Sequence, residues 1–430
     1  MIATSFVLPA DHPQRRALND EVHARPPDNL EAPVRLSYLV LVGSGSRADD
    51  LAQLSQLIEG TGAPKPAADA NHYSADLGSH RIKWERHTEF CRYTIYTQGV
   101  EKKPFSEPAI SLIPQQWLQS LKGQTIAAIH ANVVSGTRAL DPVKTADTYF
   151  NGNTIIGSLI SGGTGRAYTD FRIHADGFGR LLLCDHHMTP RQAGRLVQRL
   201  FEIDTYRMMA LLALPVARSL TPQLGKAERE LLEIMDAMQT AGDAEEPVLL
   251  DRLTKLEASV ERQYTDSQYR FTAANAYYDL VQQRIEELRE ERIEGFQTFR
   301  EFNDRRFLPA IATCRAVSAR QSALSERIAH ATVLLSTRVS VSREKQNQMI
   351  LQSMDRRANL QLRLQQTVEG LSVAAITYYI VGLVYYAAKG LLPLHSGVTP
   401  EFVAAIAIPL ALLAVGIGLR RFRKSLDDKS

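Results

Sequence analysis

Two long apolar runs near the end of the chain constrain its fold more than any other feature. Residues 371–388 and 402–419 each form a stretch of about 18 residues without a charged side chain, the lower limit for crossing a hydrocarbon layer roughly 30 Å thick. Tyrosines near the ends of the first run suit a membrane interface. The pattern predicts two transmembrane helices joined by a short outer loop, 389–401, although a buried helical hairpin in a soluble core would have similar composition.

Basic residues flank the two runs on one side. The first run is preceded by arginines at 356, 357 and 363, and the second is followed by basic residues at 420, 421, 423 and 424. The connecting loop carries Lys389 as its one basic residue. Because positive charge stays on the cytoplasmic side, we expect two spans with the N-terminus and the basic tail, 420–430, both cytoplasmic. Pro409 inside the second run requires a neighbouring helix to satisfy the freed carbonyl, which favours a homo-oligomer.

Composition narrows the class of protein. The 430 residues carry 50 Lys plus Arg against 47 Asp plus Glu, a net charge of +3, which argues against nucleic acid as a partner. Cys91, Cys184 and Cys314 lie far apart, so neither a disulfide framework nor a thiolate zinc site is indicated. The expected partners are the lipid bilayer, further copies of the chain and a cytosolic partner of unknown kind.

The first 188 residues read as an α+β cytosolic domain with a mainly antiparallel sheet. Alternating or β-branched runs predict strands, and the Asp176-Gly177 pair predicts a hairpin. The expected strands are 34–43, 81–97, 125–134, 168–175 and 180–185, with a helix at 48–59. On 81–97 the pattern places Ile82, Trp84, Phe90, Thr94 and Tyr96 on one face.

Beyond residue 188 the sequence predicts only helices. Thr189, Pro190 and Gln192 predict the start of a helix with a capping box. This helix begins a helical domain, 189–310, in which further helices are expected at 221–240 and 247–307. A long stalk helix, 311–370, follows and runs into the first span. Its apolar positions approximate helical spacing without a strict heptad: Leu324, Ile328, Leu335, Val339, Met349, Leu360, Leu364 and Val368. This pattern favours packing against the preceding helices over a self-associating coiled coil.

The N-terminal segment 12–27 is dense in ionisable residues. Histidine is a ready metal ligand and arginine a bidentate partner of anions, so the segment is a candidate ligand site, with structural capping as the alternative. The candidate residues are His12, Arg15, Arg16, Glu21, His23 and Arg25. Leu18 and Val22 are expected to seat a short helix on the sheet.

Further polar clusters are candidates for binding. Glu85, His87 and Glu89 are expected on one strand, the last two on one face, where they suit a cross-strand pair or an acid/base couple. Asp185, His186 and His187 follow a strand and suit a divalent metal ion, with His130 and His174 as candidate neighbours. The glycine-rich run 157–166 lacks the Walker signature and favours a turn over a nucleotide site. No catalytic motif is present, so an enzyme is not predicted.

The whole chain resembles an uncharacterised bacterial family, domain of unknown function 3422, described as predicted membrane-anchored proteins. The likeness lies in HPQRRALNDEVHARPP at 12–27, WERHTEFCRYT at 84–94 and the paired spans. It implies the bacterial inner (plasma) membrane and no particular activity. We therefore expect a tether or sensor whose α+β domain binds a ligand or partner.

The order of parts is also similar to that of CorA-type magnesium transporters. The Gly-Met-Asn signature that this likeness requires after the first span is absent, and Lys389 stands in the equivalent region, where it would repel a cation. Ser372 and Thr377 are the polar residues available to line a pore. An oligomeric CorA-like channel is thus an alternative, and a membrane-tethered metal-dependent enzyme is a second one.

Overall fold

The computed structural model describes residues 9–23, 26–99, 104–136, 141–391 and 399–427. The chain divides into two compact units. Unit 1 is drawn from residues 1–239 and 251–332, and unit 2 from residues 240–250 and 333–430. Each unit is described separately below.

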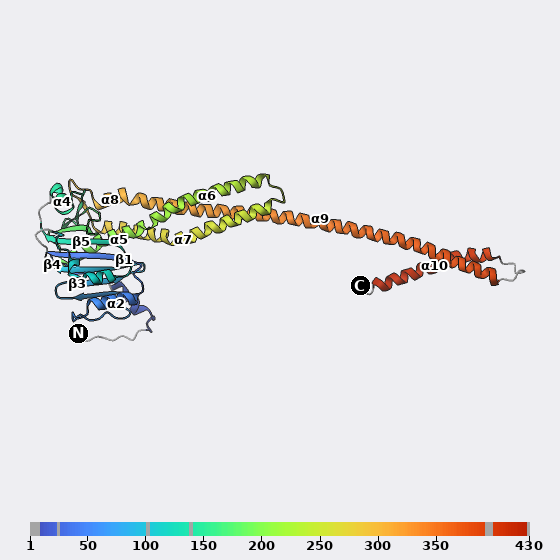
Figure 1. Ribbon diagram of the computed structural model, residues 1–430, viewed down its shortest axis with the longest axis horizontal. Helices are drawn as coiled ribbons and strands as arrows, with labels where there is room; N and C mark the ends of the chain where they lie inside the picture. The colour runs from blue at the N-terminus through green and yellow to red at the C-terminus, as the bar shows by residue number, and fades with distance from the viewer. Residues whose placement is uncertain (1–8, 24–25, 100–103, 137–140, 392–398, 428–430) are drawn as a thin grey trace. The chain divides into compact units, whose positions relative to one another are not determined.

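Unit 1 is built on one mixed sheet (Figure 1). Its described residues form nine strands in the order β2-β3-β4-β1-β5-β8-β7-β6-β9. The strands are β1 (Val34–Val42), β2 (His72–Asp76), β3 (Arg81–Arg86), β4 (Phe90–Gln98), β5 (Gln124–Ser135), β6 (Ile156–Ile160), β7 (Gly165–Thr169), β8 (Gly179–Asp185) and β9 (Glu291–Arg292). Among these neighbours only β5 and β8 run parallel, so the prediction of a mainly antiparallel sheet is confirmed.

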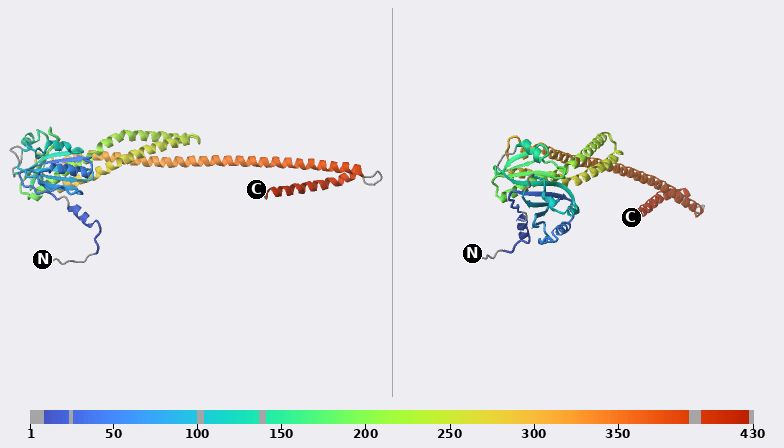
Figure 2. Two further views of the ribbon diagram at one scale, coloured as in Figure 1. Left: turned by 60° about the horizontal axis from the view of Figure 1, so that its bottom comes forward. Right: turned by 60° about the vertical axis from the view of Figure 1, so that its left-hand side comes forward.

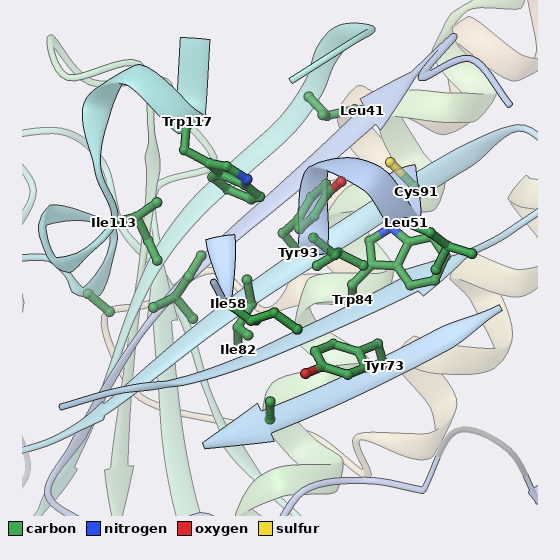
Figure 3. Close-up of a cluster of buried hydrophobic side chains, with 14 residues drawn as sticks. Leu41, Leu51, Ile58, Tyr73, Ile82, Trp84, Cys91, Tyr93, Ile113 and Trp117 are labelled. Atoms are coloured by element: carbon green, nitrogen blue, oxygen red, sulfur yellow. The ribbon is translucent and has the colours of Figure 1, made fainter. Parts of the chain in front are cut away.

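Helices cover both faces of this sheet. Those that precede β9 are α1 (Arg15–His23), α2 (Arg47–Leu57), α3 (Gln115–Ser120), α4 (Pro142–Tyr149), α5 (Pro190–Leu211), α6 (Ala213–Thr240) and α7 (Glu246–Glu287), with a 3-10 turn η1 (Ala109–Leu112). On one face, α2 and α3 enclose an apolar cluster that includes Trp84, Tyr93 and Trp117 (Figure 3). On the other face, α5 stacks Phe201 on Tyr38 of β1, with ring centroids 4.3 Å apart.

The predicted strand 81–97 is two strands. The chain turns at 87–89, and β3 pairs with β4 so that Trp84 lies opposite Tyr93 and Lys83 opposite Thr94. Residues opposite one another share a face of the sheet, so Trp84 faces α2 whereas Thr94 faces α5. The predicted common face was wrong because a three-residue turn resets the alternation.

The start of α5 is confirmed in detail. Thr189 caps the helix, its side chain accepts from the Gln192 backbone, and the capping box is complete. The prediction that no strand follows was wrong, since β9 interrupts the expected helix 247–307 and pairs with β6. Arg289 and Gly295, both with positive φ, turn the chain on either side of β9 before α8 (Phe299–Arg306) begins.

The last helix of unit 1 is the first part of α9 (Leu308–Leu391), one helix of 84 residues. At 1.5 Å per residue its length is about 125 Å. Its first part packs beside α6 and α7 (Figure 2). Arg320 Nε donates to Glu228 of α6 at 2.7 Å, and Thr332 Oγ1 donates to Glu257 of α7 at 2.8 Å.

In unit 2, the end of α9 is followed by α10 (Pro400–Asp427), which contains Pro409. Two helices in the described residues are long and apolar enough to cross a membrane: the helix that ends at Leu391, whose most apolar stretch of 18 residues has a mean hydropathy of 1.6, and Pro400–Arg421, with a corresponding value of 2.6. Tyr385 donates to Glu401 across the hairpin at 3.4 Å. The structure thus has an α+β domain, long helices and a C-terminal apolar hairpin.

The apolar positions of α9 divide into two groups. Leu324, Ile328, Leu335 and Val339 are buried, as packing against earlier helices predicts. Met349, Leu360, Leu364 and Val368 are 53–67% exposed. For these four residues the prediction of intrachain packing was wrong, because the described part of the chain supplies no element to cover them.

Candidate functional site

A cavity of about 350 Å³ lies between α5 and the sheet in unit 1. Its floor comes from β5 and β8, and its sides come from α5, the segment after β7 and the start of α8. The walls are mainly apolar and include Ile129, Phe171, Leu181, Leu200, Met208 and Phe299. A volume of this size suits a small organic ligand.

Arg207 of α5 is the main buried cation in this wall. The side chain is 9% exposed, and its Cζ lies over the Phe171 ring, 4.1 Å from the ring centroid, and 5.6 Å from that of Phe302. Its Nη2 donates to Asp204, one turn earlier on α5. Aromatic faces attract a cation and hold the guanidinium in place against the cavity.

Charged residues occupy the neighbouring part of the α5 face. Arg92 Nε donates to Glu85 at 2.5 Å, and its Nη1 lies 3.6 Å from Glu202 of α5. Burial acts to raise the pKa of Glu85, but the attraction of Arg92 and Lys83 outweighs it and lowers the pKa. These buried charges are paired, as burial requires, so Glu85 has a structural role in joining the sheet to α5.

The segment that directly follows the N-terminal motif, residues 28–30, enters this network. Asp28 lies 3.2 Å from Lys83 and accepts a hydrogen bond from Tyr96 at 2.8 Å. The chain then meets α5, where the Leu30 amide donates to Pro190 O at 2.9 Å. A Cβ on Gly194 would lie 1.7 Å from the Asp28 carbonyl oxygen. The segment 28–30 therefore needs glycine at this point of α5, a requirement that no sequence pattern in the segment itself indicates.

The predicted ligand residues of the motif do not join this cavity. His12, Arg15 and Arg16 are exposed at the start of α1, where Arg15 pairs with Asp11. Arg25 lies outside the described residues, as do the side chains of Glu21 and His23, although both positions belong to α1. Leu18 is 60% exposed, so its predicted packing on the sheet was wrong, and the side chain of Val22, predicted to pack with it, lies outside the described residues.

The second predicted group separates in the fold. His87 and Glu89 lie in the turn between β3 and β4, not on a strand face as expected, and only Glu85 lies on β3. Glu89 accepts two hydrogen bonds from Arg270 of α7, at 2.8 and 3.0 Å, and one from Tyr277 at 2.7 Å. Glu89 therefore fastens α7 to the sheet, which makes it unsuited to act as a free acid or base.

The third predicted group, Asp185, His186 and His187, does not form a metal site. Asp185 accepts from the Met188 amide at 2.8 Å, and His186 Nε2 lies 3.1 Å from Arg166, whose cation would repel a metal ion. His187 is exposed. No group of three or more possible metal ligands occurs in the part of the chain that the structure describes. The glycine-rich run forms the hairpin between β6 and β7, as the turn interpretation predicts.

Sequence reasoning missed a serine–histidine–aspartate chain on the α2 face, in which the serine and histidine are buried and the aspartate is exposed. Ser37 Oγ lies 2.9 Å from His130 Nδ1, and His130 Nε2 lies 3.8 Å from Asp176. Ser37 is 0% exposed and also accepts from the Ile110 amide, so no substrate reaches it. His174 instead contacts Asp170 at 2.9 Å. Only the pairing of β1 with β5 brings Ser37 beside His130, and this pairing cannot be predicted from a single sequence.

The polar residues of the first span lie in different surroundings in unit 2. Ser372 is exposed and donates to Val368 O of its own helix at 2.8 Å. Thr377 is buried within the unit, and its hydroxyl has no hydrogen-bond partner in the described residues.

Fold and site together define an α+β domain with a ligand-sized cavity, continued by helices into an apolar hairpin. The model of a family described as "Protein of unknown function (DUF3422)" matches residues 10–426. The chain belongs to this family. No curated protein and no solved structure matches the chain.

Proposed function

We propose that this chain is a membrane-anchored sensor or tether, whose unit 1 faces the cytosol and binds a small ligand in the cavity under α5. The observation that carries the proposal is the continuity of α9, which begins among the packed helices of unit 1 and ends in an apolar span. The same helix thus belongs to the ligand-binding domain at its start and to the proposed anchor at its end.

The proposed location is the bacterial inner membrane, with both termini in the cytoplasm. The basic residues that precede the first span and follow the second support this orientation by the positive-inside rule. The loop between the spans is too short to form a domain on the far side. Unit 1 is then the part of the protein available to cytosolic partners.

An oligomeric channel is a second candidate, favoured by the exposed apolar residues of α9. Met349, Leu360 and Leu364 precede the first span, and copies held in one membrane would present them at the same height. Several copies joined there would surround an axis with their first spans. Ser372 and Thr377 would then be the polar residues offered to a pore.

Replacement of residues 371–419 by an unrelated two-span hairpin separates the two functions. In liposomes, the sensor or tether predicts no ion flux from either protein above that of protein-free liposomes, together with equal membrane retention of both. Cation flux through the native protein that disappears on replacement would contradict the tether and establish the channel.

A further inference from the structure

The guanidinium of Arg207 is buried but only partly satisfied. Of its donors, Nη2 bonds to Asp204, and Nε has no hydrogen-bond partner among the described residues. Buried donors are almost always paired with an acceptor. The structure supplies aromatic faces to this cation, and a single carboxylate, while the cavity beside it is open and apolar.

The charge around the cavity is positive. Arg172 adds a second cation at its exposed edge, and Asp204 is the carboxylate among the described lining residues. Arg180 also borders the cavity, but its guanidinium donates to Tyr149 O on the opposite face of the sheet, where His130 lies. Arg207 shares its charge with Asp204, so Arg172 at the exposed edge leaves the lining side chains with a net positive charge, which attracts an anion.

We propose that the cavity binds an organic carboxylate with an apolar body, and that Arg207 binds the carboxylate. A carboxylate accepts two parallel hydrogen bonds from a guanidinium, and the apolar body contacts Phe299, Leu200 and the floor of β5 and β8. The proposal rests on the ligand-binding role given to unit 1 above and names the class of ligand.

The test uses the full chain in lipid nanodiscs and isothermal titration with 1-naphthoate, with empty nanodiscs to subtract lipid partitioning. The neutral isostere 1-naphthamide reports apolar binding without the charge. Arg207→Met removes the guanidinium, and Met208→Trp fills the cavity from a half-buried position of α5. Arg195→Met, an exposed arginine on the same helix, is the matched control.

We expect naphthoate to bind at least about tenfold more tightly than naphthamide, because only the anion forms charge-assisted hydrogen bonds. Arg207→Met should abolish this preference and leave naphthamide affinity unchanged, which also shows that the variant is folded. Met208→Trp should weaken both compounds, and Arg195→Met neither.

Equal affinity of the native protein for both compounds, or undiminished naphthoate binding by Arg207→Met, would overturn the assignment of a carboxylate. Binding of naphthamide that Met208→Trp abolishes would still support a ligand-binding cavity. The absence of binding by either compound would also overturn this inference, whereas the anchoring function is decided separately by the hairpin replacement.

Discussion

Single buried polar residues in this fold are held by specific partners, and His130 shows the energetic consequence. Its ring stacks on Phe178, with centroids 3.9 Å apart, and its Nδ1 meets Ser37. Burial lowers the pKa of His130 to about 4, although Asp176 acts in the opposite direction. The folded protein therefore keeps this imidazole neutral at a pH where an unfolded chain would protonate it.

Acidification from pH 7 to pH 5 should destabilise the protein through His130. The unfolded histidine binds a proton near its ordinary pKa of 6.5 and the folded one only near 4, so stability is full above the upper value and declines between the two. The contribution lost from pH 7 to pH 5 is about 2 kcal/mol. Denaturant unfolding, monitored by Trp84 and Trp117, measures it.

His130→Gln is the control for this prediction, because glutamine retains hydrogen-bonding groups but does not titrate. The variant should be less stable than the native protein at pH 7, yet its stability should fall by about 2 kcal/mol less between pH 7 and pH 5. If the free energy of unfolding falls equally in both proteins between pH 7 and pH 5, His130 is not held neutral in the folded protein.

The candidate sites predicted from the sequence were groups of residues that are close along the chain, and closeness along the chain does not keep them together in the fold. Glu85, His87 and Glu89 are close in sequence, but the turn at 87–89 sends Glu85 into the network with Arg92 and Glu89 to Arg270 of α7. The sequence gives no signal for Arg207, because an arginine in an amphipathic helix is usually exposed to solvent. Only the fold places Phe171 and Phe302 beside it.

At the scale of elements, α5 joins several parts of unit 1. Its first turn binds the segment 28–30 through the Leu30–Pro190 hydrogen bond. Its middle pairs Glu202 with Arg92, and its last turns border the cavity. The close approach of Asp28 at Gly194 leaves no room for a side chain. The seating of this segment therefore depends on one residue of α5.

Gly194→Ala should destabilise the protein by about 1–3 kcal/mol, because the new Cβ meets backbone that cannot move aside freely. Gly225→Ala on α6 is the matched control. Its nearest neighbours are arginine side-chain atoms at 3.8 and 3.9 Å, so alanine there should be neutral or stabilising by up to about 1 kcal/mol. Denaturant unfolding compares the two, and equal effects would contradict the close approach.

Local signals predicted some elements closely and misplaced the ends of others. β7 ends at Thr169 where a strand to 175 was expected, and α6 begins at Ala213 where a helix from 221 was expected. The capping residues of α5 gave its first turn, an apolar, β-branched run gave β1, and the strand expected at 125–134 matches β5 almost to the residue. The two-residue strand β9 escaped prediction because its pairing with β6 joins residues about 130 positions apart. Along α9, periodicity could not tell covered positions such as Leu335 from exposed ones such as Leu360, since both fit one helical face.

At the scale of the whole molecule, the proposed function depends on two apolar helices lying in a bilayer. Leu410 and Leu413 of α10 are each 64% exposed in the protein alone, an arrangement that suits lipid and not water. Val333 and Leu334 of α9 are 63% and 64% exposed but lie on the segment placed in the cytosol. The two pairs are matched in exposure and differ in their proposed surroundings.

Membrane fractionation with an alkaline carbonate wash tests this claim most directly. The native protein and a Val333→Arg/Leu334→Arg variant should both stay in the membrane pellet, because arginine costs little in water. The Leu410→Arg/Leu413→Arg variant should leave the membrane pellet or fail to accumulate, because each arginine in a transmembrane helix costs about 2.5–3.5 kcal/mol. Recovery of the native protein in the soluble fraction, or identical behaviour of the two variants, would contradict membrane anchoring through this hairpin.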